Sequence, residues 1–204
     1  MNQHWEPDGT ARGRVVLLHG MMSTASTWWR AGPALAGRHP RAARALVAED
    51  PPSRSHPDHA AILAAGIEAD ARLAGHDRKR LVRREREANP AWADEDVQHS
   101  VDGIAAADTA ALAAGLRGEL AWDLPAMVAA VPVPLLVLAA RPGDGFVGHG
   151  GSALQGPDRE AVRAQLPPDR FVVLDGGHCL HRDHPARWVE VVSGFADAVL
   201  AAPG

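Results

Sequence analysis

The chain has 204 residues, with 21 Lys or Arg against 25 Asp or Glu, and this balance (a formal net charge of −4) gives no reason to expect nucleic acid or an anionic membrane as a partner. The single cysteine, Cys179, excludes an internal disulfide and fits a reducing compartment. Because the segment before Arg14 lacks the apolar core of a signal peptide, and no apolar run is long enough to span a bilayer, we expect a cytoplasmic protein, whose oligomeric state the composition leaves open.

Four short apolar segments, each bounded by turn residues, predict buried strands. They span residues 14–19, 45–50, 134–140 and 170–175. Helices are expected between and after them, at 24–37, 158–165 and 184–201. Continuous apolar runs separated by helical stretches indicate a parallel sheet with crossover helices, and therefore the α/β class.

The segment between the second and third predicted strands has a different character. It is rich in alanine and helical in pattern, so we interpret residues 57–128 as a helical insertion into an α/β core of residues 1–56 and 129–204. Within it, the run Asp77–Glu87 (DRKRLVRRERE) mixes both signs of charge. Such a run is typical of a solvated helix face rather than of a nucleic-acid surface.

Polar residues follow three of the predicted strands. His19-Gly20-Met21 comes after the first strand, Asp144 shortly after the third and His178 after the fourth. Ligands of parallel sheets bind outside the carboxyl ends of the strands, so these residues predict one site. Histidine moves protons near neutral pH, and a carboxylate holds its tautomer. Each residue taken alone has the alternative interpretation of an ordinary turn residue.

In this order the motifs resemble the α/β-hydrolase family, in its capped, serine-hydrolase type. The segment Leu17-Leu-His19-Gly20, followed by Thr27-Trp28, looks like the strand and loop that supply one oxyanion-hole N–H, here from Met21. The resemblance implies hydrolysis of a small ester or related acyl substrate, with no cofactor, no metal and a small molecule as the partner.

The acid and the base of the family's triad also have counterparts. Gly177-His178, ahead of an amphipathic C-terminal stretch, looks like the triad histidine, and Asp144 looks like the triad acid. Asp50, at the end of the second predicted strand, is the alternative acid, because the family sometimes places it there.

The family's nucleophile is missing from the sequence. A serine of that kind lies in a Gly-x-Ser-x-Gly turn between a strand and a helix, and no serine here has glycine on both sides at that spacing. The stretch between Gly20 and Ala45 leaves room for one helix only. We therefore infer an internal deletion, which leaves a shortened sheet of about four strands and removes the nucleophile.

Four serines are weak candidates for a replacement nucleophile by location, although each is more simply a turn or capping residue. They are Ser23, Ser26, Ser53 and Ser55. Activity is therefore expected to be weak or lost, and the alternative function is a non-catalytic remnant that binds a small molecule.

The run from His178 to Pro185 (HCLHRDHP) is near the metal-binding string of metallo-hydrolases with a β-lactamase-like fold. The first spacing differs by one residue, and the chain after His184 is too short for that family's further ligands. The simpler expectation is a helix that Asp183 caps and that has Pro185 in its first turn.

Overall fold

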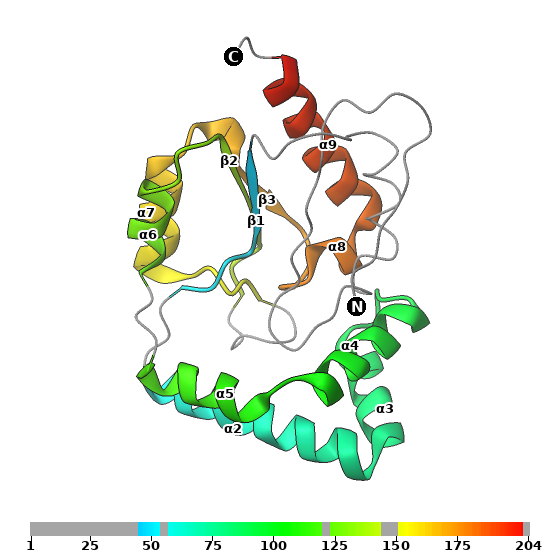
Figure 1. The fold of residues 1–204 in the computed structure, drawn as a ribbon. Helices are drawn as coiled ribbons and strands as arrows, with labels where there is room; N and C mark the ends of the chain where they lie inside the picture. Colours follow the sequence, from blue (N-terminus) through cyan, green and yellow to red (C-terminus); the bar gives the residue numbers. More distant parts are fainter. Residues whose placement is uncertain (1–44, 54–56, 120–122, 144–150, 202–204) are drawn as a thin grey trace. The chain divides into compact units, whose positions relative to one another are not determined.

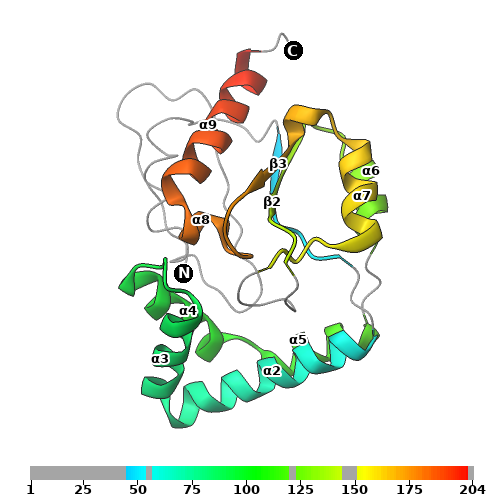
Figure 2. The same cartoon turned by 180° about the vertical axis from the view of Figure 1, so that it is seen from behind.

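The structure, a computed structural model, describes residues 45–53, 57–119, 123–143 and 151–201. The strand expected at 14–19 and the helix expected at 24–37 lie outside them. The described residues belong to two compact units, which Figures 1 and 2 show from opposite sides. We call residues 57–119 the helical unit, and residues 45–53, 123–143 and 151–201 the sheet unit.

The sheet unit contains a parallel sheet of three strands in the order β1, β2, β3. The strands are β1 (Leu46–Glu49), β2 (Leu135–Ala140) and β3 (Phe171–Leu174). Each begins and ends within one residue of the bounds predicted from its apolar run. The α/β class is therefore confirmed, but the described sheet has three strands rather than about four.

Helices cover both faces of this sheet (Figures 1 and 2). The elements are α6 (Leu124–Ala129), α7 (Gly156–Gln165), a 3-10 turn (Pro168–Arg170), α8 (Leu180–Asp183) and α9 (Pro185–Ala201). Successive side chains of a strand point to opposite faces. Leu136, Leu138 and Ala140 pack against α8 and α9, so Val137 and Ala139 face α6 and α7. This double cover explains why β2 is buried along its whole length.

Helix α9 has the amphipathic pattern that its sequence predicts. Its buried apolar residues recur at intervals of three and four, as one helix face requires: Trp188, Val189, Val192, Phe195 and Val199. Full burial of each large apolar side chain is worth about 1.5–3 kcal/mol, so this face fixes the helix against β2.

The helical unit is built around its longest helix. Its elements are α2 (Pro57–His76), α3 (Arg78–Ala88), α4 (Asp94–Ala106), α5 (Thr109–Ala114) and a π-helical turn (Gly115–Glu119). On α2, Ala60, Ala64 and Ile67 recur every three or four residues and are buried. Leu81 and Val101 form the contact between α3 and α4.

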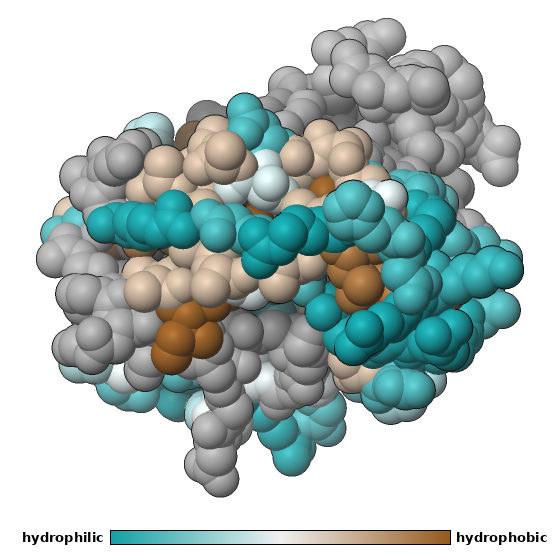
Figure 3. All heavy atoms as spheres, turned by 90° about the horizontal axis from the view of Figure 1, so that it is seen from below, coloured by the Kyte–Doolittle hydropathy of each residue, from teal (hydrophilic) through white to brown (hydrophobic). Residues whose placement is uncertain are grey.

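Several basic residues of the mixed-charge run on α3 are paired with acidic residues. Three of its arginines pair with carboxylates elsewhere in the helical unit: Arg78 with Asp102, Arg84 with Asp70 and Arg86 with Asp94. In Figure 3 hydrophilic colours gather on the right of the face seen from below and in a band across it, pale brown lies on either side of this band, and the darkest brown forms a few spots. Among the helices of the described residues, none has the length and apolar character needed to cross a membrane.

Candidate functional site

Two consecutive acids, Glu49 and Asp50, end β1 at the carboxyl edge of the sheet. Asp50 has a φ of +40°, a left-handed conformation that costs a residue with a Cβ about 1–2 kcal/mol. Its carboxylate lies against the end of β2, where the Ala140 N–H donates to Oδ1 at 3.0 Å. The side chain has no exposed surface. The turn after β1 therefore places a buried acid at the point where ligands of parallel sheets bind.

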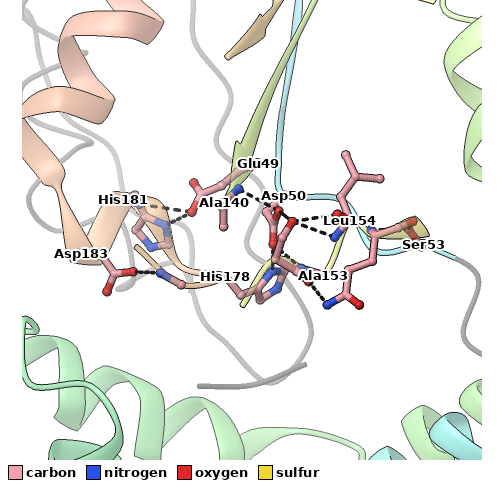
Figure 4. A network of polar contacts seen from close by, with 12 residues as sticks. Glu49, Asp50, Ser53, Ala140, Ala153, Leu154, His178, His181 and Asp183 are labelled. Atoms are coloured by element: carbon pink, nitrogen blue, oxygen red, sulfur yellow. Dashed lines mark hydrogen bonds and ion pairs between the residues drawn. The ribbon is translucent and has the colours of Figure 1, made fainter. Parts of the chain in front are cut away.

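His178 lies on the loop between β3 and α8, directly after two glycines. Gly176 has a φ of +122°, which essentially only glycine adopts, and a Cβ there would lie 2.7 Å from Oδ2 of Asp183. The same Oδ2 accepts a hydrogen bond from the Gly177 N–H at 2.6 Å (Figure 4). Asp183 therefore fixes the turn that delivers His178.

This contact corrects the expectation that Asp183 caps the C-terminal helix. Asp183 is the last residue of α8, and α9 begins two residues later at Pro185. Its carboxylate is engaged by the Gly177 N–H because α8, a single turn, folds back over the preceding loop. Pro185 does lie in the first turn of α9, as its missing N–H allows.

Asp50 and His178 form a hydrogen-bonded pair. His178 Nδ1 lies 2.9 Å from Oδ2 of Asp50, and the imidazole keeps 38% of its surface exposed while the carboxylate keeps none. An ionised carboxylate only accepts hydrogen bonds, so Nδ1 carries the proton and Nε2 has the lone pair. The result is a partly exposed base whose tautomer a buried acid fixes.

A hydrogen-bond network surrounds the carboxylate of Asp50 (Figure 4). Asp50 accepts hydrogen bonds from the Ser152 hydroxyl and, at 2.6 Å, from the Ala153 N–H. The buried Arg159 donates to Ser152 Oγ at 3.1 Å and, at 3.0–3.1 Å, to two backbone carbonyls. These donors compensate for the loss of water around a buried charge.

The hydrogen bond between Asp50 and His178 shifts the pKa of both residues. Burial alone would raise the pKa of Asp50, but the hydrogen bonds from His178, Ser152 and Ala153 outweigh it and lower the pKa from 3.8. Burial likewise opposes the charged form of His178, but the hydrogen bond to Asp50 and the charges of Asp50 and Glu49 raise its pKa above 6.5. The pair therefore favours an ionised acid beside a readily protonated imidazole.

These shifts predict how the pair's contribution to stability depends on pH. The lowered pKa of Asp50 makes its contribution present above pH 3.8 and lost as the pH falls through the folded value. The raised pKa of His178 makes its contribution complete below pH 6.5 and lost as the pH rises through the folded value. We expect the thermal midpoint of the wild type to exceed that of His178→Gln by more at about pH 5.5 than at about pH 9.

Circular dichroism melts at the two pH values measure this difference. His76→Gln, on an exposed residue at the end of α2, is the control and is expected to show no such change. A larger advantage of the wild type at the alkaline pH would contradict the prediction.

The structure describes some of the sequence-predicted residues and not others. His178 and Asp50 lie together. The Ser53 hydroxyl donates to the Gln155 carbonyl at 2.8 Å and accepts from the Gln155 N–H at 2.7 Å, so it ties two loops together and makes no hydrogen bond to His178. The remaining candidates lie outside the described residues: His19, Gly20, Met21, Ser23, Ser26, Ser55 and Asp144.

Two supporting residues, Ser152 and Arg159, were not predicted as part of the site. Ser152 has glycine at the family's spacing on its N-terminal side alone, and its buried hydroxyl donates to Asp50. No sequence signal points to Arg159, because a buried arginine depends on partners that tertiary packing provides. Among the described residues, no group of three or more His, Cys, Asp or Glu is arranged to hold a metal ion.

Comparisons with protein-family models, with curated proteins and with solved structures gave no match to this chain.

Proposed function

We propose that this protein is an α/β-hydrolase-like enzyme of weak activity, which hydrolyses small esters or related acyl compounds with His178 as the base and Asp50 as the acid that orients it. The observation that carries the proposal is the 2.9 Å contact between Nδ1 of the half-exposed His178 and the fully buried carboxylate of Asp50. A histidine held in this way at the carboxyl edge of a parallel sheet is suited to proton transfer.

The proposed step follows from the tautomer. With its proton on Nδ1, His178 has a lone pair on Nε2, which takes a proton from the attacking hydroxyl or water as that oxygen bonds to the acyl carbon. The same Nε2–H then protonates the leaving alkoxide when its bond to the acyl carbon breaks. Asp50 stabilises the imidazolium that exists between these events.

In this proposal the attacking atom is the oxygen of a water molecule. The described serine candidate, Ser53, is engaged with Gln155, and Ser152 is buried and bonded to Asp50. A positioned general base accelerates hydrolysis even without a covalent nucleophile.

The second candidate function is a non-catalytic protein that binds a small molecule at this edge of the sheet. The observation that favours it is that the hydroxyls of both Ser53 and Ser152 are bonded elsewhere, so neither is available to attack a substrate.

The test compares p-nitrophenyl acetate hydrolysis by the wild type with that by His178→Ala, with His76→Ala as the control for a solvent-exposed imidazole. We expect turnover in the wild type and in His76→Ala, and its loss in His178→Ala. Equal rates in all three proteins would support the binding protein instead. Labelling by a fluorophosphonate probe, mapped by mass spectrometry, separates the two routes, because it requires a base-activated serine. Labelled Ser23, Ser26 or Ser55 would overturn the water mechanism.

A further inference from the structure

We propose that Glu49 is a positioning residue of this site, which holds the segment from His178 to His181 against the end of β1 through His181. Oε1 of Glu49 lies 2.8 Å from Nδ1 of His181 and accepts a hydrogen bond from the His181 N–H at 3.2 Å. This inference rests on the proposed role of His178 as the base.

The two acids that end β1 thus hold two histidines of one segment. Asp50 pairs with His178, and Glu49 pairs with His181, three residues further along the chain (Figure 4). A single hydrogen bond would leave the segment free to pivot about its contact point. Two contacts three residues apart fix both the position and the rotation of the segment, and with them the direction in which Nε2 of His178 points.

The Glu49–His181 pair is almost removed from solvent, with side-chain exposures of 13% and 9%. The other carboxylate oxygen of Glu49, Oε2, is buried and has no hydrogen-bond partner among the described residues. Such an atom destabilises the folded state by about 1–3 kcal/mol. An amide would serve as an anchor without burying this charge, so the observation points to a use for the charge itself.

His178 is the group that this charge acts on. Among the described residues, the acids whose charges act on its ring are Asp50 and Glu49, both from the end of β1. The titratable residues on the loop and on α8 that follow it are Cys179, His181, Arg182 and Asp183. The negative charge of Glu49 favours the protonated form of His178, the form that donates the proton to the leaving group.

The experiment replaces Glu49 by glutamine, which keeps an acceptor oxygen for His181 but removes the charge. Because the side chain keeps its shape and its oxygen still accepts from His181, we expect the variant to fold. The His178 imidazole is titrated by NMR, with His178→Ala for assignment, and we expect its midpoint to be lower than in the wild type. Asp175→Asn removes an exposed carboxylate from the end of β3 and serves as the control with an unchanged midpoint.

Glu49→Asp separates position from charge, because it keeps the charge and shortens the reach to His181. We expect its His178 midpoint to lie above that of Glu49→Gln, while kcat for ester hydrolysis falls by up to about 100-fold and KM changes far less. An unchanged His178 midpoint in Glu49→Gln, or an unchanged kcat in Glu49→Asp, would overturn the proposal. A wild type without turnover would refute the proposed function alone, since the midpoint in Glu49→Gln still tests the charge of Glu49.

Discussion

Replacement of Asp50 by alanine is expected to lower the free energy of unfolding by about 3–5 kcal/mol, the effect of removing one member of a buried, hydrogen-bonded charge network. The carboxylate accepts hydrogen bonds from Ala140, Ser152, Ala153 and His178. Its loss leaves the two backbone N–H groups buried without an acceptor. It also removes one of the two negative charges, those of Asp50 and Glu160, that act on the guanidinium of Arg159.

Urea denaturation followed by circular dichroism measures this change. Asp175→Ala is the matched control, because Asp175 also follows a strand of the sheet but is 64% exposed and forms an ion pair with the exposed Arg141. Exposed ion pairs contribute about 0–1 kcal/mol, so we expect the control to remain close to the wild type. A change below about 1 kcal/mol in Asp50→Ala would contradict the network as the structure has it.

The described sheet was largely predictable from the sequence, for a reason that β2 illustrates. Its run of six apolar residues is flanked by Pro134 on one side and by Arg141-Pro142 on the other, and only a strand covered on both faces needs such a run. The differences of one residue at the strand ends are no larger than the usual uncertainty of element bounds. The sheet has three described strands, and the fourth predicted strand, at 14–19, lies outside the described residues.

The site was predictable only in part. His178 follows from its place after β3, but Asp50 was the second choice of acid behind Asp144, which the family resemblance favours and which lies outside the described residues. Spacing alone does not reveal that the chain turns into a left-handed conformation at Asp50. Nor does it reveal that Ser152 and Ala153, about a hundred residues away, complete the network.

The sequence contains a pattern that indicates the pairing of Glu49 with His181. Two adjacent acids end a strand, and two histidines three residues apart follow another strand of the same sheet. Parallel strands bring their carboxyl ends to one edge, so these four side chains are expected at that edge, although β2 lies between the two strands that carry them. Which acid takes which histidine depends on the Gly176–Gly177 turn, and this requires the structure.

Replacement of Asp50 by asparagine is expected to lower ester turnover by about 10²–10⁴-fold, whereas the rival acid is Asp144. An amide at this position presents its NH₂ group to Nδ1 of His178, which forces the ring proton onto Nε2, where the ring no longer accepts one. If the amide turns round instead, its NH₂ group faces the Ala140 N–H, another donor. The first orientation removes the tautomer on which proton transfer depends, and the second keeps it only with two donors facing each other. Both also remove the negative charge that stabilises the imidazolium.

Asp144→Asn is the matched variant, and we expect it to retain the turnover of the wild type. Initial rates with p-nitrophenyl acetate at saturating substrate are compared for the folded proteins, with circular dichroism confirming that each is folded. If Asp144→Asn lost turnover while Asp50→Asn kept it, Asp144 would be the acid and the Asp50–His178 contact would be structural. Loss in Asp50→Asn alone would mean that this protein relies on the acid at the end of β1, where a buried, hydrogen-bonded carboxylate holds Nδ1 of His178.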